Sequence, residues 1–150
     1  QLFHPGDLDY IHSVERISKL SNVISINGGV QLDLMGQENA ESVGTRQLSG
    51  IGGQMDFLEG AFRSKGGKGF ICINSSRVTK DGQRKSNILA TIPGGSTISA
   101  PRTMIQYVAT EYGIASLSGK TLRERAEAMA SIAHPDFREE LLKYARENFK

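Results

Sequence analysis

The sequence has no tryptophan, a single cysteine and only four prolines among its 150 residues. One cysteine excludes an internal disulfide and fits a reducing compartment. No apolar run approaches the ~18 residues of a membrane-spanning helix, and no signal peptide is visible in the sequence. These absences predict a soluble, cytoplasmic protein of one domain with a mainly aliphatic core. The chain begins with Gln1 and has no disordered leader, which indicates a segment of a longer polypeptide.

Charge of one sign is also lacking, because 18 basic and 16 acidic residues leave a formal net charge of +2. This balance excludes an extended nucleic-acid surface. A local basic excess between Arg63 and Arg84 has two interpretations: a solvated face or an anion site.

Metal-ligand spacing is absent. His4, His12 and His134 lie far apart and no cysteine pair accompanies them, so we expect no metal. No G-x-S-x-G sequence supports a nucleophilic serine. Cys72 lies in the apolar run "GFICI", which predicts a buried structural thiol.

Glycine, by contrast, is abundant, with 17 residues in all, and three of them fall within "SGIGGQMDF", residues 49–57. A dinucleotide fingerprint fails because Met55 stands where its last glycine belongs. A Walker loop fails at Gly67-Lys68 because Phe62 and Gly69 occupy its required glycine and hydroxyl positions.

A more general interpretation of this stretch remains. Glycines that lead into a helix present unobstructed backbone N–H groups beside the positive end of the helix dipole. Such a loop can hold a phosphate or an oxyanion that develops on an acyl carbon. Alternatively, the glycines only permit a tight turn, and Gln54 and Asp56 only complement the helix dipole.

The remaining pattern alternates strands and helices, which predicts an α/β domain with a mostly parallel, short-stranded sheet flanked by helices. A helix over residues 8–20 and a polar loop over residues 35–49 are expected. The glycine pair 28–29 predicts either a hairpin or a sharply kinked strand. The other expected elements are strands in 22–26, 30–34, 69–73, 88–92 and 103–110, a hairpin loop over 74–87, and a helix from about 54 to 65.

The last two helices carry start signals. Thr121 and Glu124 fit a capping box, and Pro135 fits the first turn of the final helix, with His134 before it as a capping or packing residue. Phe137, Leu141 and Tyr144 form the apolar stripe of that helix. Glu111, at the end of an expected strand, is either a functional acid or the anchor of a turn.

Three long stretches occur in an order and spacing that resemble the C-terminal domain of the acetyl-CoA hydrolase/transferase family. They are "GTRQLSGIGGQMDFLEGAFRSKGGKG", "PRTMIQYVATEYGIASLSGKTLRERA" and "IAHPDFREELLKYA", and "VISINGGVQLDLMGQ" is similar to a lesser degree. The family includes 4-hydroxybutyrate, butyrate and acetate CoA-transferases. The resemblance implies that residues 1–150 are a single CoA-transferase-like domain, the C-terminal half of a two-domain enzyme.

The resemblance also implies ping-pong chemistry through a glutamyl-CoA thioester, with coenzyme A entering as acyl-CoA and a small carboxylate as acceptor. The nucleophilic glutamate is expected upstream, in the N-terminal half of the polypeptide, and a homodimer is the family's usual assembly. Two alternatives stay open, namely an acetyl-CoA hydrolase of the same family and a catalytically silent binding or dimerisation domain.

Site residues follow from the resemblance. The stretch Gly50, Ile51, Gly52, Gly53 and Gln54 is expected to bind CoA and its thioester. Backbone N–H groups there, at Gly52 above all, are expected to stabilise the oxyanion, and the side chain of Asn27 is a second candidate donor.

Overall fold

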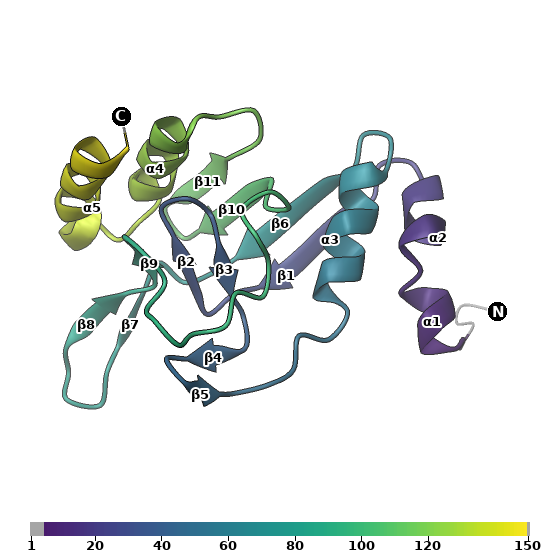
Figure 1. Cartoon of the computed structure of the whole chain (residues 1–150), viewed down its shortest axis with the longest axis horizontal. Coiled ribbons are helices and arrows are strands. Elements are labelled where there is room, and N and C mark those ends of the chain that lie inside the picture. The colour runs from purple at the N-terminus through teal and green to yellow at the C-terminus, as the bar shows by residue number, and fades with distance from the viewer. Residues whose placement is uncertain (1–4, 150) are drawn as a thin grey trace.

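The computed structural model describes residues 5–149 as a mixed α/β domain (Figure 1). The predicted fold class is therefore confirmed. In chain order the elements are α1 (Leu8–Ile11), α2 (Val14–Lys19), β1 (Ile24–Gly28), β2 (Gln31–Asp33), β3 (Glu38–Asn39), β4 (Ser42–Val43), β5 (Arg46–Gln47), α3 (Gln54–Arg63), β6 (Lys68–Cys72), β7 (Ser76–Val78), β8 (Arg84–Ser86), β9 (Ile88–Leu89), β10 (Tyr107–Thr110), β11 (Gly113–Ser116), α4 (Leu122–Ser131) and α5 (Pro135–Asn148).

The main sheet, sheet A, has the strand order β1-β6-β10-β11. β1, β6 and β10 run parallel, and β11 returns antiparallel to β10 as an edge strand. The β1–β6 register pairs Ile24 with Lys68 and Gly28 with Cys72, so both strands end at the same level. The carboxyl ends of the parallel strands therefore share one edge of the sheet.

One face of sheet A carries the core. Ile71 of β6 and Val108 of β10 are fully buried there, and Leu58 of α3 packs into the same cluster. α3 lies over β1 and β6, and α4 contacts β11 and α5 (Figure 1). Gly69 allows the approach of α3, because a Cβ at that position would meet Leu58 Cδ2 at 2.9 Å.

In the region where we expected a polar loop, β3 forms and joins β2 and β9 in a smaller sheet with the order β3-β2-β9. That prediction for residues 35–49 is wrong: β3, β4 and β5 form there, and Glu38, Asn39 and Ser42 are buried. Residues 99 and 100 explain the difference, because the main chain of Glu38 bonds with that of Ser99 and Ala100. A pairing between residues more than 60 positions apart leaves no local pattern in the sequence.

Two predictions in the N-terminal part also need correction. Residues 8–20 form two short helices, α1 and α2, instead of one, because His12 ends α1 and the Ser13 side chain caps α2. Gly28 ends β1 and Gly29 follows it, and β1 and β2 belong to different sheets, so neither a hairpin nor a kinked single strand forms.

Several expectations in the C-terminal half are confirmed. Residues 74–87 form the β7–β8 hairpin. The Thr121–Glu124 capping box is present, and Pro135 lies in the first turn of α5, where the His134 side chain accepts a hydrogen bond from the Asp136 amide.

Candidate functional site

The glycine-rich loop, which we define as residues 50–53, ends directly at the first residue of α3. Its N–H groups donate to no backbone carbonyl among the described residues. Gly52 has a φ of +61°, and a Cβ on Gly50 or Gly52 would meet no atom within 4 Å. The loop thus presents open, unpaired backbone at a helix N-terminus, where the helix dipole favours negative charge.

Gly53 lies against the imidazole of His12. A Cβ at position 53 would lie 2.2 Å from His12 Cε1, so no other residue fits without displacing the ring. His12 Nδ1 is also 3.4 Å from Asp56 Oδ2, and the ring packs edge-on against Phe57 at a centroid distance of 5.2 Å. The segment between α1 and α2 therefore packs against the first turn of α3 through the His12 side chain.

Glu38 connects the other side of the loop to sheet A. Its Oε2 accepts a hydrogen bond from Gln54 Nε2 at the first position of α3. A Cβ on Gly29, the residue after β1, would lie 3.0 Å from its Oε1, which has no hydrogen-bond partner among the described residues. The carboxyl group thus lies between the end of β1 and the start of α3, and bonds to the α3 side.

This carboxyl group is fully buried, and burial raises its pKa to about 8 although the Gln54 hydrogen bond acts to lower it. Burial penalises the charged form of an acid, so Glu38 is mostly protonated at neutral pH. A neutral carboxylic acid carries an O–H donor, which a carboxylate lacks. The site therefore includes a proton held out of contact with solvent.

Gln54 and Asn27, both candidate site residues from the sequence, use their amides inside the protein. The Gln54 side chain is buried against Glu38. Asn27, half-buried in β1, donates from Nδ2 to Ser25 Oγ at 2.8 Å. One such bond leaves the second N–H of the Asn27 amide free to donate elsewhere. Gly50, Ile51 and Gly52 are the exposed part of the candidate stretch.

The carboxyl ends of β1, β6 and β10 surround a hollow of about 440 Å³. Its lining consists of Gly29, Cys72, Ile73, Asn74, Ala109, Thr110 and Glu111. Open α/β sheets place ligands at this edge. Glu111 accepts from the Ser75 amide at 2.9 Å and from Ser75 Oγ at 2.6 Å, which supports its role as the anchor of a turn. Cys72 is exposed, so the prediction of a buried thiol is wrong.

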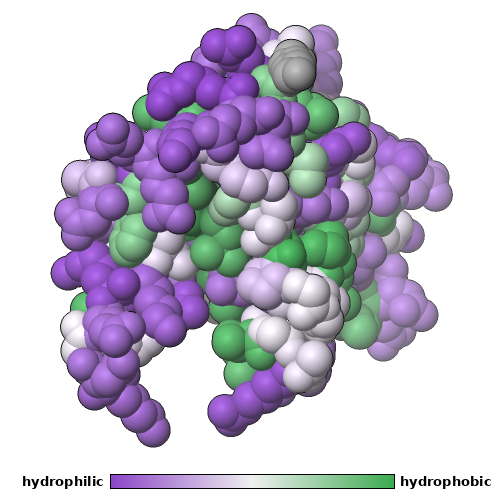
Figure 2. Space-filling model, turned by 60° about the vertical axis from the view of Figure 1, so that its left-hand side comes forward, coloured by the Kyte–Doolittle hydropathy of each residue, from purple (hydrophilic) through white to green (hydrophobic). Residues whose placement is uncertain are grey.

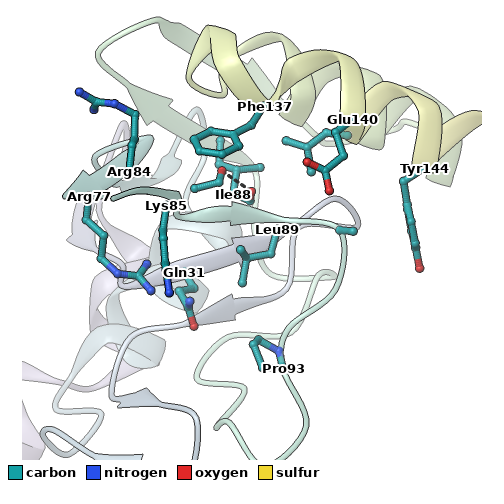
Figure 3. A pocket seen from close by; sticks show the side chains of 13 residues that line it. Gln31, Arg77, Arg84, Lys85, Ile88, Leu89, Pro93, Phe137, Glu140 and Tyr144 are labelled. Atoms are coloured by element: carbon teal, nitrogen blue, oxygen red, sulfur yellow. Dashed lines mark hydrogen bonds between the residues drawn. The ribbon is translucent and has the colours of Figure 1, made fainter. Parts of the chain in front are cut away.

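A second hollow, of about 460 Å³, lies between α5, β9 and the β7–β8 hairpin (Figure 3). Figure 2 shows hydrophobic side chains gathered at the middle of one hollowed face, with hydrophilic ones around them. Arg77, Arg84 and Lys85 line the cavity. Arg77 donates to Asn87 and Arg84 donates to Ser76 Oγ, so both arginines brace the hairpin. Residues 50–53 of the glycine-rich loop are not among the residues that line either hollow.

Sequence reasoning missed Glu38 and His12 as neighbours of the loop. The burial of Glu38 depends on distant chain pairing, and His12 lies 41 positions before Gly53. The only local signal for His12 was the glycine at position 53, whose missing Cβ makes room for the ring. Within residues 5–149 we find no cluster of His, Cys, Asp and Glu suited to a metal ion, and His4 lies outside the described residues.

None of the helices in the described part of the chain has the length and hydrophobicity required to cross a membrane.

Residues 2–145 match the family model described as "Acetyl-CoA hydrolase/transferase C-terminal domain". The chain is 47% identical over 138 residues to a butyryl-CoA:acetate CoA-transferase of Anaerostipes caccae, covering 92% of this chain and 31% of that protein. It is 46% identical over 142 residues to a 4-hydroxybutyrate coenzyme A transferase of Clostridium kluyveri, covering 95% and 32%.

A solved structure agrees as well. The 4-hydroxybutyrate CoA-transferase of Porphyromonas gingivalis superposes with a TM-score of 0.73 at 40% identity, over 94% of this chain and 30% of that one. The chain thus spans about a third of the length of the relatives it matches.

Proposed function

Because the chain belongs to the acetyl-CoA hydrolase/transferase family as its C-terminal domain, we propose that it is the CoA-binding part of an acyl-CoA:carboxylate CoA-transferase. The names of the relatives support butyryl-CoA, 4-hydroxybutyrate and acetate as the substrate class. The region that precedes this domain in the complete polypeptide supplies the other side of the active site.

The proposed reaction begins with a glutamate carboxylate of that preceding region. One carboxylate oxygen attacks the thioester carbon of acyl-CoA, and the CoA thiolate leaves to give an acyl-glutamyl anhydride. The thiolate then attacks the glutamyl carbonyl of the anhydride, and the acyl group of the substrate leaves as its free carboxylate. The resulting glutamyl-CoA thioester passes CoA to the incoming carboxylate by the same two steps in reverse.

In each step a carbonyl oxygen becomes an oxyanion, and this is where the described residues act. The observation that carries the proposal is the row of unpaired N–H groups in the glycine-rich loop at the N-terminus of α3. One preorganised donor of this kind is worth about 2.7–4 kcal/mol in comparable acyl-transfer sites. The second N–H of the Asn27 amide is the other candidate donor.

Gly52→Val in the complete enzyme is expected to lower turnover more than tenfold, with the fold retained. The left-handed φ of +61° at Gly52 is strained for a β-branched residue, so the loop amides lose their orientation. The open space around the position leaves the core undisturbed. The measurement is kcat with acetyl-CoA and butyrate, together with the thermal unfolding midpoint.

Gly50→Ala is the matched control, because its Cβ enters open space and its φ lies outside the left-handed region. It is expected to keep kcat within about threefold, since a well-tolerated alanine changes local free energy by under ~1 kcal/mol. Near-wild-type turnover of Gly52→Val would contradict the oxyanion role of the loop.

A hydrolase of the same family is the second candidate, and the family description itself names both activities. Release of free CoA from acetyl-CoA, measured with and without a carboxylate acceptor, separates the two. A transferase forms new acyl-CoA only when the acceptor is present. The 150-residue chain alone is expected to do neither, and clear transfer by it would place the nucleophile within this domain.

Two further expectations accompany the proposal. A homodimer and a cytoplasmic location remain predictions from the sequence, which sedimentation of the purified enzyme and cell fractionation would test.

A further inference from the structure

Within residues 5–149, the face of sheet A opposite the core is exposed. Side chains alternate between the two faces of a strand, and the strand register groups the outward ones across all four strands. We call this set the open face: Ile24, Ile26, Gly28, Lys68, Phe70, Cys72, Tyr107, Ala109, Ile114 and Ser116. In the described structure each of them is at least partly exposed.

The open face is apolar where a solvated face would be polar. Ile26 is 69% exposed, Ile114 63% and Ile24 54%, and Lys68 is the only charged residue of the set. Phe70 and Tyr107 stack on neighbouring strands at a centroid distance of 4.9 Å. Antiparallel sheets that face water alternate apolar-in and polar-out, whereas parallel strands are usually covered on both faces.

Sheet A also has a free edge at β1, because β1 ends the strand order. An unpaired edge beside an apolar face is a site that proteins ordinarily cover. α3 and α4 cover the opposite face, so the described helices leave this one open.

We propose that the open face is the docking surface for the region that precedes this domain in the complete polypeptide. About two thirds of the relatives' length lies outside the part that this chain matches, and the matched part is a C-terminal domain. Cys72 and Ala109 belong to the open face and also line the hollow at the carboxyl ends of the strands. A cover on this face therefore reaches the edge where the catalytic carboxylate is needed.

The choice of the preceding region over a second copy of the chain rests on the proposed function. That the face is covered rests only on its composition and geometry.

Cys72 provides the test, because it is the only cysteine of the chain and lies on the open face. The substrate-free complete enzyme carrying Val78→Cys is treated with N-ethylmaleimide, and tryptic peptides are followed by mass spectrometry. Val78 is 59% exposed on the β7–β8 hairpin, so its replacement is an exposed reference thiol in the same molecule. Covered thiols are inert, and we expect Cys72 to react at least ~100-fold more slowly than the reference. Equal rates would overturn the proposal.

Dilution identifies the occupant. With the preceding region as the cover, Cys72 stays protected when the enzyme is diluted to its monomeric form, followed by mass photometry. If protection disappears as the enzyme dissociates, a second copy is the cover and the assignment is wrong.

A pair of aspartate variants gives an independent result. Ile26→Asp places a charge in the apolar interface and is expected to raise the Cys72 rate at least ~10-fold, while Val78→Asp leaves it unchanged. Protected Cys72 in an enzyme without CoA transfer supports the interface and contradicts the proposed function. Reactive Cys72 in an active enzyme overturns the interface alone.

Discussion

Replacing Glu38 with glutamine is expected to remove most of the loss of stability that the domain suffers between pH 5 and pH 8. In the unfolded chain a glutamate titrates near 4.5, whereas burial raises the pKa of Glu38 to about 8 in the folded protein. Below both values the carboxyl group is protonated in both states and costs nothing. Between them only the unfolded state ionises, so stability falls as the pH rises, and above the folded pKa the loss is complete.

The size of the effect follows from the pKa difference. Each pKa unit corresponds to about 1.4 kcal/mol, so the free energy of unfolding is expected to fall by several kcal/mol across this range. Glu38→Gln keeps the volume and a carbonyl oxygen that accepts from Gln54, but it does not ionise. Urea unfolding at pH 5, 6, 7 and 8 measures the slope.

An exposed carboxylate gives the control. Glu139 lies on the solvent side of α5, and Glu139→Gln is expected to leave the pH slope unchanged. A wild-type protein with constant stability from pH 5 to pH 8 would show that Glu38 is ionised, and hence solvated, in the folded state.

Arg125→Met is expected to destabilise the domain by at least ~3 kcal/mol, because it leaves three buried or partly buried carbonyls without a donor. Arg125 Nε donates to Met35 O at 2.7 Å, Nη1 to Leu117 O at 2.8 Å and Nη2 to Arg102 O at 2.8 Å. The guanidinium thus fastens α4 to three separate segments of chain. Gly36 makes room for it, since a Cβ there would lie 2.6 Å from Nη2.

Arg123 on the same helix is the matched control. It is 55% exposed and, among residues 5–149, pairs with Glu127, four positions away, so Arg123→Met is expected to cost under ~1 kcal/mol. Arg125→Lys, which retains the charge but not the three-way geometry, is expected to fall between the two. Equal unfolding midpoints for both methionine variants would contradict this account of Arg125.

Local signals predicted the elements that depend on local chemistry. The capping box at Thr121, Pro135 at the start of α5 and the glycines before α3 each act within one turn of chain, and the structure has all three elements. The resemblance of three long stretches predicted the family, which the family model confirms.

Features that depend on chain pairing at a distance were not predictable in this way. Glu38 is buried because Ser99 and Ala100 pair with it, and no pattern near residue 38 records this. Cys72 is the opposite case, a residue expected to be buried that is exposed. An apolar run indicates that a strand is buried, but not which face of the sheet other elements pack against. "GFICI" therefore gave a correct strand and a wrong environment for its thiol.

The contact between His12 and Gly53 limits how far this domain can be shortened from its N-terminal side without changing the start of α3. A shortened chain that began after α2 would keep every strand of sheet A, yet it would lose the ring that rests on Gly53 and the partner of Asp56. The side-chain hydrogen bond between Gln54 and Glu38 would remain at the start of α3. For limited proteolysis and for domain exchange between relatives, the functional boundary therefore lies ahead of α1, although sheet A begins only at β1.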